Sequence, residues 1–269
     1  MKTLFSGMRK VYIGLMLVLL YSPVALMIVL SFSESKTTWT GFSLVKYQAL
    51  FQNERVMDAF FTSILLALLS AAVATVLGTV ACMGLLAMKK KLRSAVTSVA
   101  NIPLLNADIV TGFSLMLFFA AIVGRMSYAT LFISHITLVL PYVILNVYPK
   151  LCQFDRSIYD AALDLGASPV QAFFKVILPD VFPGLLTGFL LALTISMDDF
   201  TITYFTKGRG LDTLSTYIYN TYHIKGILPE YYALAAILFV GVLLMILLVQ
   251  TINVRSAARG ASAKTQKSK

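Results

Sequence analysis

Long apolar runs alternate with short polar segments along the whole chain. A helix needs about 20 residues to cross the roughly 30 Å hydrocarbon core of a bilayer. Six runs reach that length, interrupted only by aspartates, and they cover residues 11–33, 59–88, 94–124, 126–149, 181–206 and 231–254. The pattern therefore predicts an all-α integral membrane protein with six transmembrane helices, in a single transmembrane domain that covers residues 1–269.

The composition agrees with a membrane protein. Hydrophobic residues make up 58% of the chain and charged residues 13%, which is more apolar material than one soluble core of 269 residues would bury. Residues 11–33 follow three basic residues, as in a signal peptide, but they are longer than a secretory segment and no small-residue cleavage site follows. We therefore expect them to be retained as the first helix.

The basic residues are unevenly distributed between the predicted loops. Fifteen of the 22 Lys and Arg residues lie in the N-terminal tail, in segments 89–93 and 150–180, and in the C-terminal tail. Basic residues gather on the cytoplasmic side of membrane proteins. We therefore expect both termini and the 150–180 loop to be cytoplasmic, and we attribute the net charge of +10 to orientation and contact with anionic lipid rather than to nucleic acid.

The third apolar run contains residues that interrupt a helix. Pro103, Asn106, Asp108 and Gly112 all occur in the stretch NIPLLNADIVTG. A broken helix is tolerated at membrane depth only where protein or a water-filled cavity satisfies the freed backbone groups. This stretch therefore predicts an internal path through the protein.

Three aspartates inside spanning segments are candidate substrate-path residues, namely Asp108, Asp198 and Asp199. An ionisable group in a bilayer is costly and usually functional. At 1.5 Å per residue, Asp108 and Asp198 lie at similar depths, roughly 21 and 22 Å from the cytoplasmic ends of their helices, where carboxylates would bind a passing ammonium group. The alternative is a structural or helix-end role. Adjacent residues on a helix point about 100° apart, so we expect at most one of Asp198 and Asp199 to face the path.

Several other residues have two interpretations. Tyr204 and Phe205 could add cation–π contacts to the path, but packing is the simpler explanation. A lone histidine within a predicted spanning helix, such as His135, is more often an interhelical hydrogen-bond donor than a proton relay. Gly184 and Gly188 form a small-xxx-small pattern, which indicates close helix packing.

Residues 156–179 are polar yet have helical periodicity. The apolar positions recur with the helical repeat, at Ile158, Ala161, Ala162 and Leu165. Asp160 and Asp164 lie on another face, Gly166 follows as a C-cap glycine, and Ser168 with Gln171 forms a capping box for a second helix. We expect a helix–glycine turn–helix unit. Anionic lipid would repel its aspartates, which favours a protein partner over the alternative of an interfacial helix.

This segment resembles the EAA loop of binding-protein-dependent ABC import permeases, with Asp160 where the family usually has Glu. The matching residues are Asp160, Ala161, Ala162, Gly166, Ile177, Leu178 and Pro179. The resemblance implies the MetI-like permease fold, with the loop as the coupling helix that fits a groove on a cytoplasmic ATPase. The residues it implies for coupling are Asp160, Ala161, Ala162, Asp164, Gly166, Ser168, Leu178 and Pro179.

Further stretches resemble the permease subunits of spermidine/putrescine importers, namely YSPVALMIVLSFSES, WTGFSLVKYQALF, HITLVLPYVILNVY, TISMDDFTITYFTKG and PEYYALAAIL. The resemblance implies an ATP-driven polyamine importer in the bacterial inner membrane. It also implies three kinds of partner: a homologous second permease subunit, an ATPase dimer that binds ATP and Mg²⁺, and an extracytoplasmic polyamine-binding protein. Two departures are Ala107, where relatives commonly have Pro, and TKGRG in place of a turn with Gly-Pro.

Other functions remain open at this point. The chain has no GxxxxGK[ST] motif for ATP phosphates, and its cysteines, Cys82 and Cys152, lack metal-ligand spacing, so we expect no bound cofactor or metal and no enzymatic activity. The alternatives are an ABC permease for another small cation, a membrane enzyme that uses Asp198 and Asp199 as paired carboxylates, and a stand-alone proton-coupled carrier. Against the membrane enzyme, the sequence shows no nucleophile with a partnered base.

Overall fold

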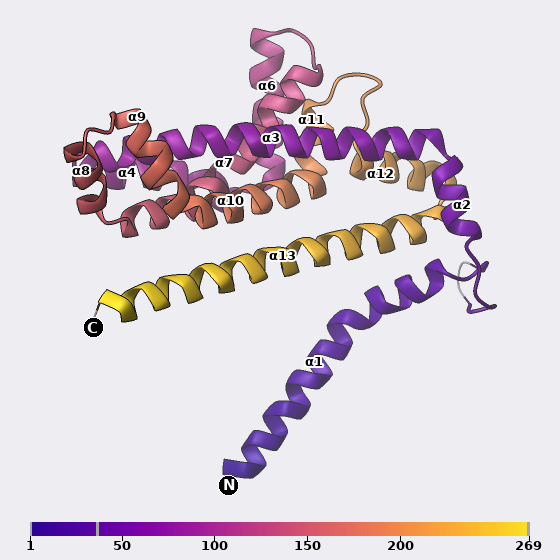
Figure 1. Cartoon of the computed structure of the whole chain (residues 1–269). Coiled ribbons are helices and arrows are strands. Elements are labelled where there is room, and N and C mark those ends of the chain that lie inside the picture. The colour runs from indigo at the N-terminus through magenta and orange to yellow at the C-terminus, as the bar shows by residue number, and fades with distance from the viewer. Residues whose placement is uncertain (1, 36–37, 268–269) are drawn as a thin grey trace. The chain divides into compact units, whose positions relative to one another are not determined.

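A computed structural model describes the backbone of residues 2–35 and 38–267, and the side chains of residues 10–35, 38–102, 104–247 and 251. This part of the chain is helical and divides into two compact units (Figure 1). The smaller unit runs to Asp58 and includes Tyr219–Leu244, and the larger contains Ala59–Ile218 and the chain from Met245. The helices are, in order, α1 (Lys2–Ser31), α2 (Val45–Gln52), α3 (Glu54–Ala87), α4 (Lys90–Ala100), α5 (Ile102–Leu105), α6 (Asp108–Ile122), α7 (Tyr128–Gln153), α8 (Arg156–Asp164), α9 (Pro169–Ala172), the π-helical turn η1 (Phe173–Ile177), α10 (Leu178–Asp198), α11 (Thr201–Thr206), α12 (Leu214–Lys225) and α13 (Glu230–Lys267).

Five described segments are long and apolar enough to cross a membrane. They are Lys10–Ser31, Glu54–Ala87, Tyr128–Gln153, Pro169–Asp198 and Glu230–Leu247. The prediction of an all-α membrane protein is confirmed at this level. The remaining predicted span, residues 94–124, is divided into α4, α5 and α6, and α6 is apolar but only 15 residues long.

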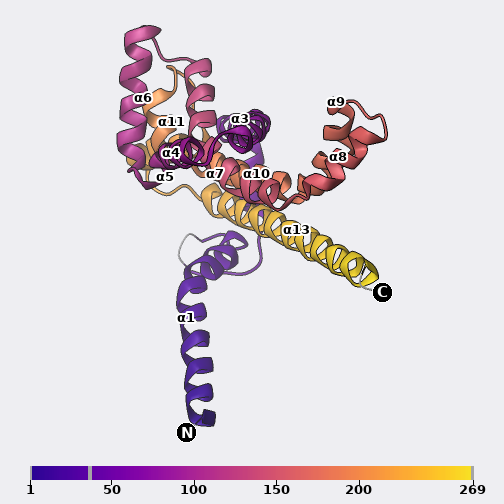
Figure 2. The ribbon, with the colours of Figure 1, turned by 90° about the vertical axis from the view of Figure 1, so that its left-hand side faces the viewer.

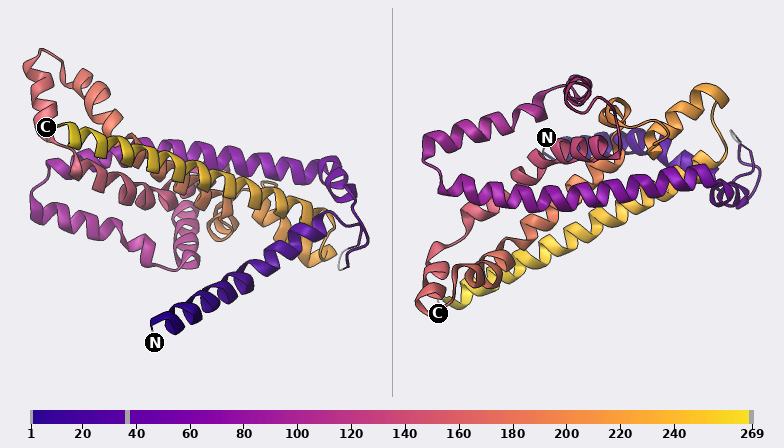
Figure 3. Two further views of the ribbon diagram at one scale, coloured as in Figure 1. Left: turned by 60° about the horizontal axis from the view of Figure 1, so that its bottom comes forward. Right: turned by 90° about the horizontal axis from the view of Figure 1, so that it is seen from above.

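The interruption predicted in the third apolar run is present. The chain turns back after α3, near Met88 and Lys89, so that α4 runs in the opposite direction (Figure 3). The helical backbone then ends at Asn101 and again at Asn106, where the backbone becomes extended. The residue before α6, Ala107, is also extended, and α6 starts a new helix rather than continuing α5.

The prediction of one continuous helix over residues 181–206 was wrong. α10 ends at Asp198, the backbone of Asp199 is extended, and α11 begins at Thr201. Apolar periodicity does not reveal this break because the residues on both sides are equally apolar. The predicted loop at 150–180 is also shorter than expected, since α7 runs to Gln153 and a helical segment resumes at Pro169.

The core of the larger unit lies between α3, α7 and α10, which run alongside one another (Figure 1). Its buried residues are Ala71, Ala74, Cys82, Leu85, Val139, Val143, Ile144, Val147, Leu151, Val181, Leu185 and Ala192. A Cβ at Gly184 would lie 2.6 Å from Cγ of Lys150, and one at Gly188 would lie 3.4 Å from Cβ of Asn146, both on α7. The prediction of close packing at these glycines is confirmed.

A buried lysine ties together the smaller unit. Lys46 on α2 is 1% exposed, and its Nζ donates to the carbonyl oxygens of Leu30 (2.7 Å) and Ser35 (2.8 Å). The same ammonium lies 4.4 Å from the ring centroid of Tyr232 on α13. A cation at the C-terminal end of α1 satisfies free carbonyl groups and interacts favourably with the negative end of the helix dipole.

Candidate functional site

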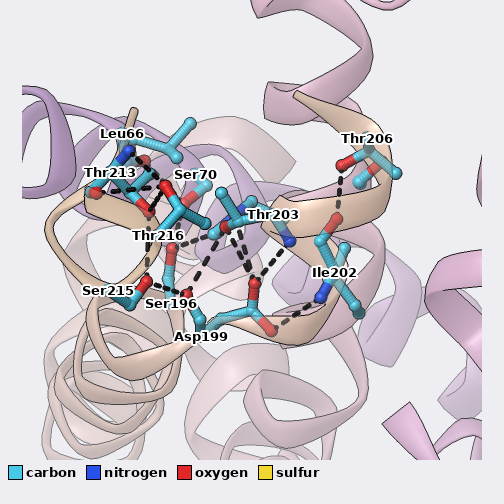
Figure 4. A network of polar contacts seen from close by, with 12 residues as sticks. Leu66, Ser70, Ser196, Asp199, Ile202, Thr203, Thr206, Thr213, Ser215 and Thr216 are labelled. Atoms are coloured by element: carbon cyan, nitrogen blue, oxygen red, sulfur yellow. Dashed lines mark hydrogen bonds and ion pairs between the residues drawn. The ribbon is translucent and has the colours of Figure 1, made fainter. Parts of the chain in front are cut away.

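The first part of the candidate site is the break between α10 and α11. The Asp199 carboxylate accepts the backbone N–H of Ile202 at 3.2 Å through Oδ1 and that of Thr203 at 2.8 Å through Oδ2 (Figure 4). It also accepts the Thr203 hydroxyl at 2.9 Å. A carboxylate here satisfies free N–H groups at the start of α11 and interacts favourably with the positive end of the helix dipole. Asp199 therefore closes the break.

A buried polar network surrounds this carboxylate. The ring of His135 on α7 is fully buried, with Nδ1 2.7 Å from Oγ of Ser196 on α10 and Nε2 2.9 Å from Oγ1 of Thr203 on α11. Oγ of Ser196 is also 3.0 Å from Oγ of Ser70 on α3 (Figure 4). The network thus joins four helices, and the interpretation of His135 as an interhelical hydrogen-bonding residue is confirmed.

The two adjacent aspartates have different environments. The side chain of Asp199 is 7% exposed, and its Oδ2 lies 3.7 Å from Nε2 of His135. Asp198 is exposed and forms no hydrogen bond or ion pair with the described part of the chain. Asp199 therefore has the structural role that the sequence left open, whereas the Asp198 carboxylate is available to a ligand.

The chain that follows α11 is anchored to the same region. The Ser215 hydroxyl donates to the backbone oxygen of Asp199 at 2.7 Å, and the backbone N–H of Leu214 donates to Oγ of Ser63 on α3 at 2.7 Å. Between α11 and α12, Lys207 forms an ion pair with Asp212. These bonds hold the start of α12 against the break.

The second part of the site is the start of α6, which packs beside α11 (Figure 2). Asp108 is the first residue of α6, is exposed, and forms no hydrogen bond or ion pair with residues that the structure describes. One turn later, Gly112 is buried, and a Cβ there would lie 3.0 Å from Cδ2 of Phe205 and 3.3 Å from Cα of Ile202. The structure therefore brings the first turns of α6 alongside α11.

The two candidate aromatic residues differ in their contacts. Phe205 is half-buried, and its ring lies 5.9 Å from that of Phe113 on α6 and 5.7 Å from that of Tyr204. Tyr204 is 48% exposed. Phe205 therefore has the packing role that the sequence favoured, and Tyr204, whose ring also lies 5.5 Å from that of Phe200, is the more exposed of the two.

An open cavity of about 460 Å³ lies at the junction of α5 and α6, in the stretch for which the sequence predicted an internal path, but sequence reasoning missed the α6 residues that line it. Its lining residues are Ile102, Asn106, Thr111, Ser114, Leu115 and Phe118. The Asn106 amide donates to Oγ1 of Thr111 at 3.1 Å. Thr111, Ser114, Leu115 and Phe118 recur at i, i+3, i+4 and i+7 and so share one face of α6. The polar pair Thr111 and Ser114 on that face of an apolar helix was the sequence signal that could have predicted the lining.

Residues 156–179, the α8 segment, have the predicted form of helix, glycine turn and helix. Gly166 has φ +87°, its N–H donates to the carbonyl of Leu163 at 2.9 Å, and the N–H of Ala167 donates to that of Ala162 at 3.1 Å. These are the two bonds of a Schellman motif, which requires a left-handed residue at this position. The capping box predicted around Ser168 is also present.

The α8 segment exposes apolar and acidic side chains together. α8 and α9 project beyond the end of α10 (Figure 2), and α8 contains no buried residue. Leu165 is 90% exposed and Ile158 is 48% exposed. The residues expected to couple to the ATPase are mostly exposed. Ala162 and Leu178 are half-buried, and the exposed ones are Asp160, Ala161, Asp164, Gly166, Ser168 and Pro179. Among the described residues, no group of three or more His, Cys, Asp or Glu could hold a metal ion.

Comparison with known proteins identifies relatives over most of the chain. The family described as "Binding-protein-dependent transport system inner membrane component" matches residues 8–258. The putrescine transport system permease protein PotI of Escherichia coli (strain K12) is 33% identical over 242 residues, which cover 87% of this chain and 86% of that protein. The spermidine/putrescine transport system permease protein PotC of the same strain is 34% identical over 235 residues, covering 87% and 89%.

A solved structure also resembles this chain. A chain of the MetNI methionine ABC transporter, in an inward-facing conformation, matches with a TM-score of 0.55 at 19% identity, covering 76% of this chain and 99% of that chain. At this identity the likeness shows the fold alone. The expected MetI-type permease fold is therefore confirmed.

Proposed function

Because this chain belongs to the family of binding-protein-dependent transport system inner membrane components, we propose that it is a transmembrane subunit of an ATP-driven importer of polyamines such as putrescine and spermidine. The names of PotI and PotC support this substrate class. A subunit of this family transports and does not catalyse. Its proposed partners are a homologous second permease, an ATPase dimer that binds ATP and Mg²⁺, and an extracytoplasmic polyamine-binding protein.

The proposed topology has six crossings in one transmembrane domain, with both termini in the cytoplasm. The five long apolar helices and the apolar α6 support it, with α4 to α6 forming the third crossing. The excess of Lys and Arg in the predicted cytoplasmic segments supports the orientation.

The α8 segment is the proposed contact with the ATPase. Its exposed leucine and isoleucine, beside exposed aspartates, suit a protein surface better than lipid. The Schellman motif and the capping box fix the two short helices relative to each other. A fixed element can transmit a displacement of the ATPase to α10, because α9, η1 and α10 form one helical segment.

The observation that carries the proposal for the substrate path is the pair of free carboxylates at two helix interruptions. Asp108 and Asp198 are exposed and have no partner in the described chain, and α6 lies beside α11. An ammonium group would form charge-assisted hydrogen bonds with such carboxylates, and weak sites in series allow both entry and release. Tyr204 would add a cation–π contact.

Polyamine uptake by the reconstituted assembly tests this proposal. The variants Asp108→Asn and Asp198→Asn should each lower putrescine and spermidine uptake by about tenfold or more, because each loses a charge-assisted contact. Asp58→Asn is the matched control, since Asp58 is exposed and lies outside both interruptions. Parental uptake rates in both path variants would remove the acidic path, and absence of polyamine uptake by the parent would remove the substrate class.

A further inference from the structure

A single imidazole connects the two sides of the break between α10 and α11. His135 on α7 contacts Ser196 on α10 through Nδ1 (2.7 Å) and Thr203 on α11 through Nε2 (2.9 Å). These contacts join three helices and are not set by the periodicity of any one of them. The ring therefore fixes the end of α10 relative to the first turn of α11.

The Asp199 carboxylate sets the direction of these hydrogen bonds. An ionised carboxylate only accepts, so the Thr203 hydroxyl, 2.9 Å from Oδ2, donates its one proton to Asp199. Oγ1 of Thr203 then accepts from His135, which places a ring proton on Nε2. The opposite direction would leave Oγ1 of Thr203 and Oδ2 of Asp199 in contact with no proton between them.

The other ring nitrogen is then an acceptor. A neutral imidazole carries one proton, so Nδ1 accepts the proton of the Ser196 hydroxyl. Oγ of Ser196 accepts in turn from Ser70, 3.0 Å away. The hydrogen bonds thus run in one direction, from Ser70 through Ser196, His135 and Thr203 to Asp199, with one proton for each link.

The first link has a built-in alternative. The Ser70 hydroxyl also lies 2.7 Å from the carbonyl oxygen of Leu66 in its own helix, and serine in a helix commonly bonds to the carbonyl four residues earlier. The bond between α3 and α10 can therefore open without leaving a buried donor unsatisfied. At the other end of the chain of hydrogen bonds, the Thr203 hydroxyl lies 2.9 Å from Oδ2 of Asp199 and 3.5 Å from the backbone oxygen of the same residue, so the carboxylate is its nearer acceptor.

We propose that His135 is a positioning residue of the polyamine path. Its neutral ring, protonated on Nε2, holds Thr203 and the Asp199 carboxylate in the closed break, so that Asp198 is the carboxylate presented to the cation. The transport part of this proposal rests on the proposed function. The protonation pattern of the ring does not, and it can be measured by itself.

Nitrogen NMR of the full-length chain measures this pattern directly. The chain contains two histidines, and His223→Gln removes the second, which is exposed, so ¹⁵N-histidine labelling reports on His135 alone. In lipid nanodiscs at neutral pH we expect a protonated Nε2 and an unprotonated Nδ1. A proton on Nδ1 alone, or on both nitrogens, would overturn the proposal whether or not the chain transports polyamines.

Three substitutions then test the role in transport. The side chain of His135→Gln can place an amide donor near the position of Nε2 and keep the bond to Thr203, whereas His135→Asn reaches only Ser196, and His135→Phe keeps the ring size without either bond. In the reconstituted complex we expect uptake per ATP hydrolysed to fall by about tenfold in the Asn and Phe variants and by less than about threefold in the Gln variant.

The His223→Gln chain is the control for these variants. The proposal that His135 acts through its Nε2 bond to Thr203 would be contradicted by either of two results. One is a parental value of uptake per ATP hydrolysed in His135→Asn, and the other is a Gln variant as impaired as the Phe variant. If the parent complex transports no polyamine, the proposed function fails, while the NMR result still decides the state of the ring.

Discussion

Neutralising Asp199 should destabilise the protein, whereas neutralising Asp198 should leave its stability unchanged, because only Asp199 is hydrogen-bonded within the described chain. Asp199 accepts three hydrogen bonds, at 2.8, 2.9 and 3.2 Å. In Asp199→Asn one oxygen is replaced by an NH₂ group, which cannot accept. In Asp198→Asn, the side chain that changes is exposed and has no partner in the described chain.

The magnitude follows from these contacts. A hydrogen bond to a charged group contributes about 1.5–3 kcal/mol and a neutral one about 0.5–1.5 kcal/mol. Asp199→Asn loses one charged acceptor for an N–H group and weakens the two bonds to the remaining oxygen, so we expect unfolding to become easier by about 3 kcal/mol. Asp198→Asn should stay within about 0.5 kcal/mol of the parent, as an exposed substitution does.

Thermal unfolding of the purified chain in detergent measures the difference. At about 2–4 °C per kcal/mol for a chain of this size, Asp199→Asn should lower Tm by roughly 6–12 °C, while Asp198→Asn keeps the parental Tm and loses uptake. Each variant is the other's control, since the substitution is the same at neighbouring positions. A parental Tm for Asp199→Asn, or equal losses in the two variants, would refute the division of roles.

Four further predictions concern the rest of the chain. Gly112→Ala should destabilise the protein by about 1–2 kcal/mol, because the new Cβ would lie 3.0 Å from a side chain of α11 and 3.3 Å from the α11 backbone. Gly84→Ala is the control: its new Cβ would have nothing within 4 Å, so Tm should stay equal or rise. A lower Tm for Gly84→Ala than for Gly112→Ala would count against the packing of α6 on α11. Gly166→Ala should cost about 1–2 kcal/mol, because alanine resists the left-handed backbone, and should reduce substrate-stimulated ATP hydrolysis in the assembled complex; full stimulation would argue against coupling through α8. Lys46→Met should lower Tm, since it leaves two carbonyl groups without their charged donor and costs about 1–3 kcal/mol; an unchanged Tm would mean that water replaces the lysine. Cys152 is exposed and Cys82 is buried, so a membrane-impermeant maleimide should label Cys152 in inverted vesicles and not in spheroplasts, and the opposite result would reverse the proposed topology.

The α8 segment could be predicted from the sequence because its signals are local. The glycine turn depends on Gly166, and the capping box depends on Ser168 and Gln171, all within a few residues of the helix ends that they define. Apolar runs likewise predict helices of membrane-spanning length. Local chemistry and run length thus determine most of the helical segments, though not the way in which long runs are divided.

The break after Asp198 could not be predicted in the same way. A carboxylate that caps α11 and a carboxylate that faces a cation are identical in sequence, and both lie in an apolar run. Asp199 is distinguished by its contacts with Thr203 and His135. His135 lies on α7, more than 60 residues away in the chain from its hydrogen-bond partners Ser196 and Thr203. Such a contact depends on the packing of α7 on α10 and α11.

The two interruptions differ in how completely their polar groups are satisfied. At the break between α10 and α11, the carboxylate, the imidazole and the hydroxyls bond to one another. Between α4 and α5, Oδ1 of Asn101 is buried without a hydrogen-bond partner among the described residues, and Asp108 at the start of α6 is exposed with no bond to them. An unsatisfied acceptor in an apolar setting is costly and is relieved by a donor from outside. Under the proposed function, the acceptors open to a passing ammonium would be the exposed carboxylates of Asp108 and Asp198, while the bonded network around Asp199 holds α11 in place.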